Sequence, residues 1–226
     1  MTWAPMTWAE YAAAWSALHG GFDPDRASPV VRGWIRLAYR GGSLLGRWGV
    51  GPTAVTVIGL VLCVGVPFAA LLDDGGLLLA GVLVLLASFA DGLDGAVAVV
   101  TGKVSRIGYV YDSVADRLGE VAWLAAFWLA GAPAWLAVCG GVVSWLHEYV
   151  RARATAGGMA DIGVVTMAER PTRVAVASSA LVVGGFAGLV HSGWDTVVVV
   201  LGAVTWLALA VIGAGQLIVA IRRELR

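Results

Sequence analysis

The stretch LLLAGVLVLLASFADGLDGAVAVV, residues 77–100, decides how this chain folds. Residues 77–90 carry no charged side chain, and Asp91 and Asp94 then follow inside the same apolar run. An apolar stretch of about 20 residues is long enough to cross a bilayer as a helix. Ionisable side chains inside such a stretch are costly and therefore mark functional sites. We expect a membrane helix that carries two carboxylates near one end.

The rest of the chain has the same character. Its 226 residues are 59% hydrophobic and 13% charged, a composition that a water-exposed domain of this size rarely tolerates. The sequence therefore predicts an all-α, polytopic membrane protein with six transmembrane helices. The six predicted spans cover residues 53–72, 77–100, 106–129, 134–153, 174–190 and 196–221.

The basic residues predict how these spans are oriented. The turns at 73–76, 131–134 and 191–195 contain no Arg or Lys, so all 15 basic residues fall on one side of the membrane. By the positive-inside rule, that side is the cytoplasm and both termini lie in it. We expect an integral membrane protein in which the polar ends of the second, third and fourth spans open to the cytoplasm. The formal net charge of zero gives no indication of a nucleic-acid partner.

The first 50 residues differ from the spans. Arg32, Arg36, Arg40 and Arg47 recur at near-helical spacing between apolar residues. This pattern is typical of an amphipathic helix that lies on a membrane surface. We therefore divide the chain into a cytoplasmic, interfacial region at 1–50 and a transmembrane domain at 51–226.

Two pairs of aspartates flank the short link between the second and third spans. Asp91 and Asp94 are spaced i,i+3, and Asp112 and Asp116 are spaced i,i+4, so each pair shares one helix face. Because the link at 101–105 is short, the two helices are antiparallel neighbours and four carboxylates can converge. Hard divalent cations with oxygen ligands, two of them about 3.5–4 Å apart, would balance this charge.

A different interpretation pairs the aspartates with Lys103, Arg106 and Arg117 at the membrane edge. Gly92 and Gly95 favour the metal site, because glycine costs a helix about 0.8–1 kcal/mol and leaves room for a ligand.

The pattern Asp91-x-x-Asp94-Gly95-x-x-Ala98, followed by Gly108-x-x-x-Asp112-x-x-x-Asp116, resembles the signature of the CDP-alcohol phosphotransferase family. The segment GPTAVTVIG at 51–59 is similar to the family's segment at the start of the first span. The resemblance implies transfer of a phosphatidyl-type group from CDP-diacylglycerol to an alcohol, with release of CMP. It also implies a homodimer and Mg²⁺ or Mn²⁺ as cofactor, with two ions bound.

The resemblance also assigns roles to individual residues. Asp116 would act as the base for the incoming hydroxyl. The metal ligands would be Asp91, Asp94, Asp112 and Asp116, and the CDP donor would contact Thr56, Asp91, Gly95, Ala98, Gly108 and Asp112. One position departs from the family pattern, because Val99 stands where the signature has Arg. Since Val99 lies near a helix end, we expect Val99→Arg to be tolerated and to raise activity.

Four arginines flank the fourth and fifth spans: Arg151, Arg153, Arg170 and Arg173. Arginine suits bidentate binding of a phosphate group. The elements YVRARA and ERPTR are similar to the acceptor-binding elements of actinobacterial phosphatidylinositol-phosphate synthases, whose acceptor is an inositol phosphate. The resemblance therefore implies a phosphorylated polyol acceptor in phospholipid biosynthesis. Glycerol phosphate or another alcohol stays open as the acceptor.

Two other functions are compatible with the sequence. Intramembrane acids also mark ion pathways, so a divalent-cation transporter is one alternative. The acids here cluster at one end of the membrane, whereas a pathway would spread them through its depth. The second alternative is a family member with impaired catalysis and a binding role, which Val99 makes possible.

Overall fold

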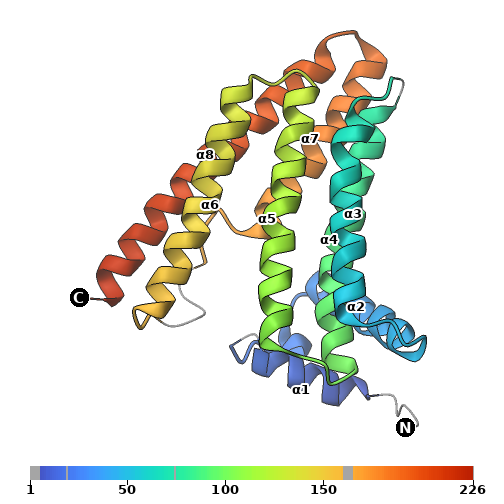
Figure 1. The fold of residues 1–226 in the computed structure, drawn as a ribbon, viewed down its shortest axis with the longest axis vertical. Coiled ribbons are helices and arrows are strands. Elements are labelled where there is room, and N and C mark those ends of the chain that lie inside the picture. The colour runs from blue at the N-terminus through green and yellow to red at the C-terminus, as the bar shows by residue number, and fades with distance from the viewer. Residues whose placement is uncertain (1–5, 19, 74, 160–164, 226) are drawn as a thin grey trace. The chain divides into compact units, whose positions relative to one another are not determined.

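The chain is all-α. The computed structural model describes residues 6–18, 20–73, 75–159 and 165–225, and within them the chain forms eight α-helices and one 3₁₀ turn (Figure 1). The elements are α1 (Trp8–Leu18), η1 (Pro24–Arg26), α2 (Pro29–Arg47), α3 (Pro52–Ala70), α4 (Gly76–Val100), α5 (Arg106–Leu129), α6 (Ala134–Ala156), α7 (Arg170–Val190) and α8 (Trp194–Glu224).

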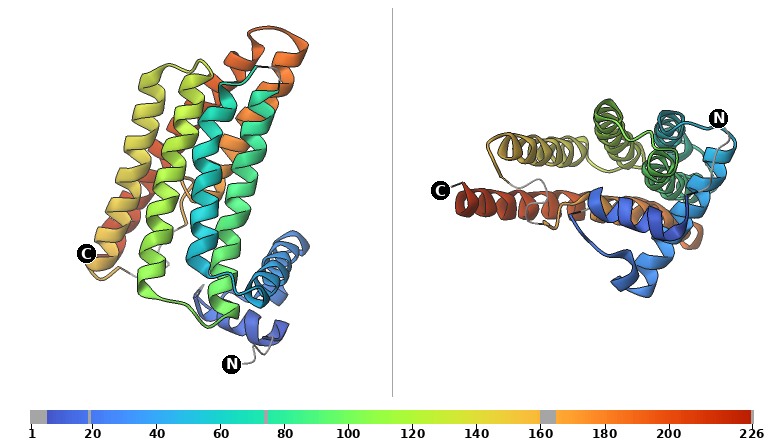
Figure 2. Two further views of the ribbon diagram at one scale, coloured as in Figure 1. Left: turned by 45° about the vertical axis from the view of Figure 1, so that its right-hand side comes forward. Right: turned by 90° about the horizontal axis from the view of Figure 1, so that it is seen from below.

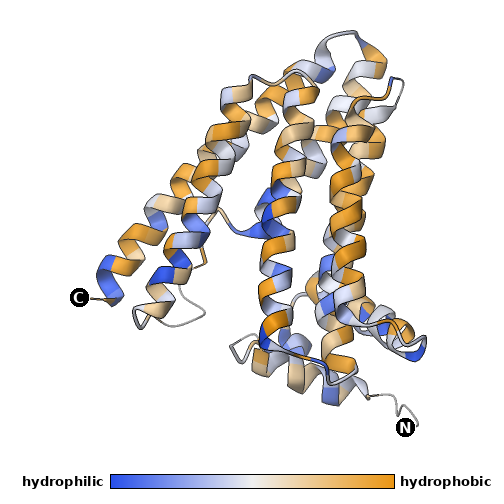
Figure 3. Ribbon diagram, in the orientation of Figure 1, coloured by the Kyte–Doolittle hydropathy of each residue, from blue (hydrophilic) through white to orange (hydrophobic). Residues whose placement is uncertain are grey.

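Each of the six predicted spans corresponds to one helix, from α3 to α8. The largest difference is at α7, which begins at Arg170 because Glu169 occupies its N-cap and a proline follows in the first turn. In the described residues, α3, α4, α7 and α8 are long and apolar enough to cross a membrane. Figure 3 shows how apolar residues dominate α3 and how polar ones interrupt α5.

The chain divides into two compact units, and α3, α4 and α5 each contribute residues to both. The first unit contains residues 1–61 and 86–116. The second contains residues 62–85 and 117–226.

In the first unit, α2 packs directly on α4. A Cβ added to Gly42 would lie 3.0 Å from the backbone of Ala96, and one added to Gly41 would lie 2.6 Å from Leu93. These glycines therefore let the two helix backbones approach closely. Ser28 caps α2 by accepting a hydrogen bond from the Val31 amide at 3.4 Å.

Helix α1, which the sequence did not predict, covers the carboxyl end of α4. Tyr11 is 1% exposed and belongs to a buried apolar cluster with Ile35 of α2 and with Val99 and Val100 of α4. Both views in Figure 2 show α1 and α2 beside this end of α4. An aromatic contact strengthens the packing, since the rings of Tyr11 and Tyr39 are 5.0 Å apart.

In the second unit, α8 packs along both α6 and α7. Small residues permit close contact, because a Cβ on Gly202 of α8 would lie 2.4 Å from the side chain of Ala180. The Trp206 indole of α8 donates a hydrogen bond to Ser144 Oγ of α6 at 3.0 Å. Its one polar atom is thereby satisfied inside an apolar core.

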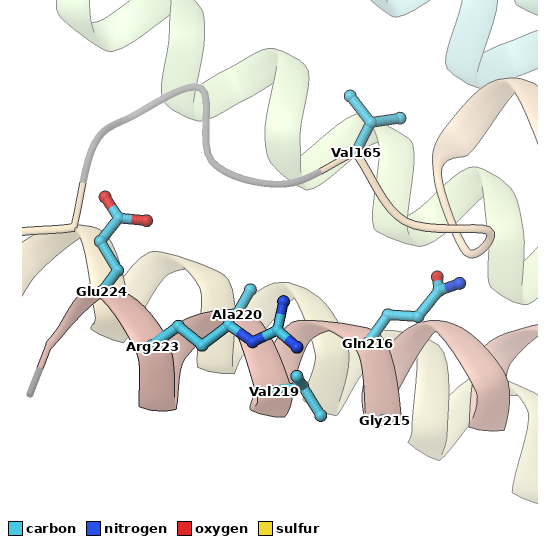
Figure 4. Close-up of a pocket in the computed structure, with 7 residues that line it drawn as sticks. All are labelled: Val165, Gly215, Gln216, Val219, Ala220, Arg223 and Glu224. Atoms are coloured by element: carbon cyan, nitrogen blue, oxygen red, sulfur yellow. The ribbon is translucent and has the colours of Figure 1, made fainter.

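The carboxyl end of α8 borders a cavity of about 580 Å³ whose wall includes Val165, Gln216 and Arg223 (Figure 4). Gln216 Oε1 accepts a hydrogen bond from the Met167 amide at 2.8 Å. None of the residues that the sequence predicts to bind donor, metal or acceptor lines this cavity.

Candidate functional site

Three of the four aspartates converge in the first unit. One carboxylate oxygen from each of Asp91, Asp112 and Asp116 lies within 4.8 Å of the other two. All three side chains are half-buried. The i,i+4 spacing on α5 places Asp112 and Asp116 on one face, and the short link at 101–105 brings Asp91 of α4 beside them. Oxygen atoms at this spacing form a donor set for a hard divalent cation.

Asp94 lies outside this group of three. It is 7% exposed, and its Oδ2 accepts a hydrogen bond of 2.6 Å from Thr56 Oγ1 of α3. The same Thr56 hydroxyl lies 3.2 Å from the Pro52 carbonyl oxygen. The structure therefore brings together Thr56 and Asp94, while the assignment of Asp94 as a metal ligand stays a prediction.

The small residues of the signature occupy different surroundings. Gly95 is exposed, and within the described residues no atom beyond its own helix turn lies within 4 Å of the position of a Cβ. Ala98, one helical turn later, is half-buried. Gly108 has a local role, since its amide donates a hydrogen bond to Ser105 Oγ at 3.1 Å. The open side of α4 at Gly95 leaves space for a ligand beside Asp91.

Val99 is buried beneath α1. It is 6% exposed and shares an apolar cluster with Tyr11, Ile35 and Ala38. The premise that this helix-end position lies open to the cytosol is wrong, because α1 and α2 cover Val99, and the structure therefore favours the opposite expectation for Val99→Arg. The sequence could not show that Val99 is buried, because the residue that covers it, Tyr11 of α1, is far from it along the chain.

We expect Val99→Arg to destabilise the protein by about 2 kcal/mol, because a cation in this cluster must either lose its hydration or displace α1. Thermal unfolding of the purified protein measures the effect. Val99→Ile is the matched control and should stay within about 1.5 kcal/mol of the parent. An arginine variant that unfolds at the parent temperature would contradict the packing described here.

The four predicted acceptor arginines all lie in the second unit, in three different environments. Arg173 of α7 is 4% exposed and donates to Glu120 Oε1 at 2.6 Å and to Glu148 Oε1 at 2.7 Å. Arg151 of α6 donates to Glu169 Oε1. Arg153 is exposed, and the guanidinium carbon of half-buried Arg170 lies 5.8 Å from the Trp123 ring centroid. Arg151 and Arg173 are thus held by carboxylates.

Glu120 and Glu148 belong to an ionic cluster, with Arg117 and Arg173, that the sequence did not predict. Glu120 of α5 is 0% exposed and lies 3.1 Å from Arg117, which in turn lies 3.3 Å from Glu148 of α6. With Arg173, the cluster holds two cations and two anions, so it is formally neutral. The i,i+3 spacing of Arg117 and Glu120 indicates an ion pair within α5, but their partners Glu148 of α6 and Arg173 of α7 are distant in sequence.

A second polar chain joins the cluster to the start of α7. Buried His147 lies 3.5 Å from Glu148 Oε1 through Nδ1 and 3.0 Å from Thr166 Oγ1 through Nε2. The Thr166 amide donates to Glu169 Oε1 at 2.9 Å. The histidine is therefore a buried structural link between α6 and the residues before α7.

The chain has relatives of known activity. Residues 50–213 match the sequence profile of CDP-alcohol phosphatidyltransferase. The archaetidylinositol phosphate synthase of Pyrococcus horikoshii is 32% identical over 139 residues, covering 60% of this chain and 71% of that protein. The phosphatidylinositol phosphate synthase of Mycobacteroides abscessus is 36% identical over 153 residues, covering 64% of this chain and 68% of that protein.

Solved structures show the same fold. The crystal structure of the Mycobacterium tuberculosis phosphatidylinositol phosphate synthase with CDP-DAG bound superposes with a TM-score of 0.64 at 26% identity, covering 82% of this chain and 94% of that one. A crystal structure of that enzyme in complex with manganese and citrate gives a TM-score of 0.63 at 26% identity, covering 82% and 88%. The profile, the curated relatives and the aspartate geometry agree, and this chain belongs to the CDP-alcohol phosphatidyltransferase family.

Proposed function

We propose that this protein transfers the phosphatidyl group of CDP-diacylglycerol to an inositol phosphate and releases CMP, in a reaction that depends on Mg²⁺ or Mn²⁺. The observation that carries the proposal is the convergence of Asp91, Asp112 and Asp116, the positions at which the family signature places carboxylates. The relatives named as phosphatidylinositol phosphate and archaetidylinositol phosphate synthases support the choice of acceptor.

The residues fit a divalent metal centre. Three half-buried carboxylates whose oxygens lie within 4.8 Å supply hard oxygen ligands, and Asp94 is one helical turn from Asp91. Asp91, Asp112 and Asp116, with Asp94, would hold one or two ions. Bound there, a divalent ion neutralises the charge on the donor's phosphates and on the leaving group. The manganese complex of the tuberculosis enzyme supports this assignment.

The chain's own groups account for the remaining steps. Open space at Gly95 and the small side chain of Ala98 admit the donor nucleotide beside Asp91, and the hydroxyl of Thr56 fixes the orientation of Asp94. The Asp116 carboxylate accepts the proton of the acceptor hydroxyl. The hydroxyl oxygen forms a bond to the phosphorus that carries the diacylglycerol, and the bond from that phosphorus to the CMP oxygen breaks.

The acceptor's phosphate would bind among the four arginines. Arginine forks can hold a carboxylate along one edge and a phosphate along another. Arg153 of α6 is exposed and Arg170 begins α7, while Glu169 and Glu148 orient Arg151 and Arg173.

We also propose the membrane arrangement. Helices α3 to α8 would form six spans of a transmembrane domain at 51–226, with both termini, the 1–50 region and the active site on the cytoplasmic side of an inner membrane. The 24 residues of α5 and the 23 of α6 give helices about 35 Å long, sufficient for the hydrocarbon core. Assembly as a homodimer follows from the family resemblance.

We expect Arg170→Ala to raise the KM for inositol phosphate about tenfold or more and to leave the KM for CDP-diacylglycerol unchanged. Charge-assisted hydrogen bonds contribute roughly 1.5–3 kcal/mol each, which sets this magnitude. The assay measures CMP release by the purified protein with inositol phosphate, glycerol phosphate, free inositol and serine. Arg222→Ala, which removes an exposed arginine at the end of α8, is the control.

Turnover with glycerol phosphate alone would keep the reaction class and replace the acceptor. Turnover with free inositol that Arg170→Ala leaves unchanged would remove the phosphate site from the proposal. If no acceptor supports CMP release, the protein is an impaired member of its family.

A further inference from the structure

Thr166 lies in the segment before α7 and is buried, with 5% of its surface exposed. Three polar groups surround its hydroxyl. Glu169 Oε1 lies 3.0 Å from Thr166 Oγ1, and Nε2 of His147 in α6 also lies 3.0 Å from it. The amide of Ala168 donates to the same oxygen at 3.3 Å. Because a hydroxyl has one proton and two lone pairs, these three partners use its full hydrogen-bonding capacity.

The chemistry of the three partners sets the direction of each hydrogen bond. Glu169 Oε1 forms an ion pair with Arg151 and therefore acts as an acceptor toward Thr166. The Thr166 proton points to Glu169, so the hydroxyl oxygen accepts from the Ala168 amide and from the imidazole. The network thus assigns a proton to Nε2 of His147. Removal of the hydroxyl would leave both Glu169 and His147 without this partner.

Glu169 connects Thr166 to one of the predicted acceptor arginines. Its Oε1 accepts hydrogen bonds from Arg151 Nη2, from the Thr166 hydroxyl and, at 2.9 Å, from the Thr166 amide. Glu169 is the N-cap residue of α7, yet within the described residues its side chain makes no capping hydrogen bond. The carboxylate is directed at Arg151 and Thr166 instead of the first turn of α7. Since Thr166 supplies two of these donors, it determines where the oxygen that receives Arg151 lies.

Exposure separates the group that can meet a ligand from the groups that support it. The Arg151 side chain is 21% exposed, whereas Thr166 is 5% and His147 1% exposed. A ligand can therefore reach the guanidinium of Arg151, while the hydroxyl and the imidazole stand behind its carboxylate partner. An arginine binds two phosphate oxygens at once only when its planar fork is correctly oriented. Loss of a supporting group should therefore weaken phosphate binding without removing a direct contact.

We propose that Thr166 is a positioning residue for the acceptor. Through Glu169, its hydroxyl holds the guanidinium of Arg151 in the orientation that binds the acceptor's phosphate, and His147 in turn holds the hydroxyl. This inference rests on the proposed function, in which Arg151 belongs to the phosphate site. Neither Thr166 nor His147 touches the substrate.

The same network reaches Arg173 only weakly. His147 Nδ1 lies 3.5 Å from Glu148 Oε1, which is long for a hydrogen bond. Arg173 also donates to buried Glu120 at 2.6 Å. Loss of the Thr166 hydroxyl should therefore leave Arg173 in place.

Thr166→Val tests this role, because valine has nearly the shape of threonine and lacks the hydroxyl. CMP release by the purified full-length protein is measured at saturating Mg²⁺ while either inositol phosphate or CDP-diacylglycerol is varied. We expect the KM for inositol phosphate to rise about tenfold, the upper end for one lost hydrogen bond. The kcat and the KM for CDP-diacylglycerol should stay within about a factor of two. A purely structural role would reduce the amount of folded enzyme, which lowers kcat and moves neither KM.

Two controls accompany this variant. Thr166→Ser keeps the hydroxyl and should retain the parent KM for inositol phosphate. Thr205→Val makes the same chemical change at an exposed position of α8 and should leave all three constants unchanged.

A second pair of variants decides the question if Thr166→Val does not fold. In His147→Gln the side-chain amide nitrogen can donate in place of the ring Nε2, whereas His147→Leu has no donor. Only His147→Leu should raise the KM for inositol phosphate.

An acceptor KM that is unchanged in Thr166→Val, or that rises equally in Thr166→Ser, would overturn the proposal. A parent protein that releases no CMP with inositol phosphate would contradict the proposed function instead. The KM comparison is then made with the acceptor that does support release: a rise of about tenfold in Thr166→Val keeps the positioning role, and an unchanged KM removes it. A protein that turns over no acceptor overturns both proposals.

Discussion

Asp112→Asn should lower CMP release by at least about 100-fold. Asp112 is one of the three carboxylates whose oxygens meet within 4.8 Å, and asparagine replaces a charged ligand with a neutral one of the same size. Stabilisation of transition-state charge by a bound cation contributes several kcal/mol, and each 1.36 kcal/mol corresponds to tenfold in rate. The measurement is the steady-state rate at saturating donor, acceptor and Mg²⁺.

The control for this loss is Asp73→Asn. Asp73 is exposed in the turn between α3 and α4 and lies in the other unit of the chain. Its replacement should leave the rate within a factor of two. An Asp112→Asn protein that turns over at the parent rate would remove the carboxylate centre from the proposed mechanism.

Arg173→Ala should destabilise the protein by about 3–5 kcal/mol. The change leaves buried Glu120 and half-buried Glu148 without this cation, although Arg117 still lies within 3.3 Å of both carboxylates. A buried ion pair that loses one partner exposes the other to the full cost of desolvation. Thermal or denaturant unfolding in detergent measures the change.

Two further variants show whether Arg173→Ala destabilises the protein through lost charge balance or through lost packing. Arg153→Ala removes an exposed arginine of α6 and should change stability by less than about 0.5 kcal/mol. Glu120→Leu/Arg173→Met replaces the buried pair by apolar residues of similar size and should recover much of the loss. If Arg173→Ala unfolds like the parent and raises the acceptor KM, the arginine serves the acceptor and the cluster does not need it.

Local spacing explains why much of the fold and the cluster of three aspartates could be predicted. The six apolar runs correspond to α3–α8, because length and apolarity are properties of each segment alone. Asp112 and Asp116 share a face because an α-helix completes one turn every 3.6 residues. The short link at 101–105 makes α4 the neighbour of α5. These inferences need no knowledge of distant contacts.

Contacts between distant segments explain what could not be predicted. Arg173 meets Glu120, 53 residues earlier, and Glu148, 25 residues earlier, so its partners are invisible to helical spacing. Val99 is buried because α1 covers it, and α1 itself has no periodic charge pattern to reveal it. Asp94 shares a face with Asp91, yet Thr56 from α3 holds its carboxylate.

Binding of Mn²⁺ tests the central claim, the carboxylate metal centre, most directly. Electron paramagnetic resonance counts free Mn²⁺ during titration of the purified protein, and it requires neither donor nor acceptor. We predict saturable binding by the parent and at least tenfold weaker binding by Asp91→Asn/Asp112→Asn, with Asp73→Asn indistinguishable from the parent. Equal Mn²⁺ affinity in the parent and in a folded Asp91→Asn/Asp112→Asn protein would contradict the metal centre and the mechanism built on it.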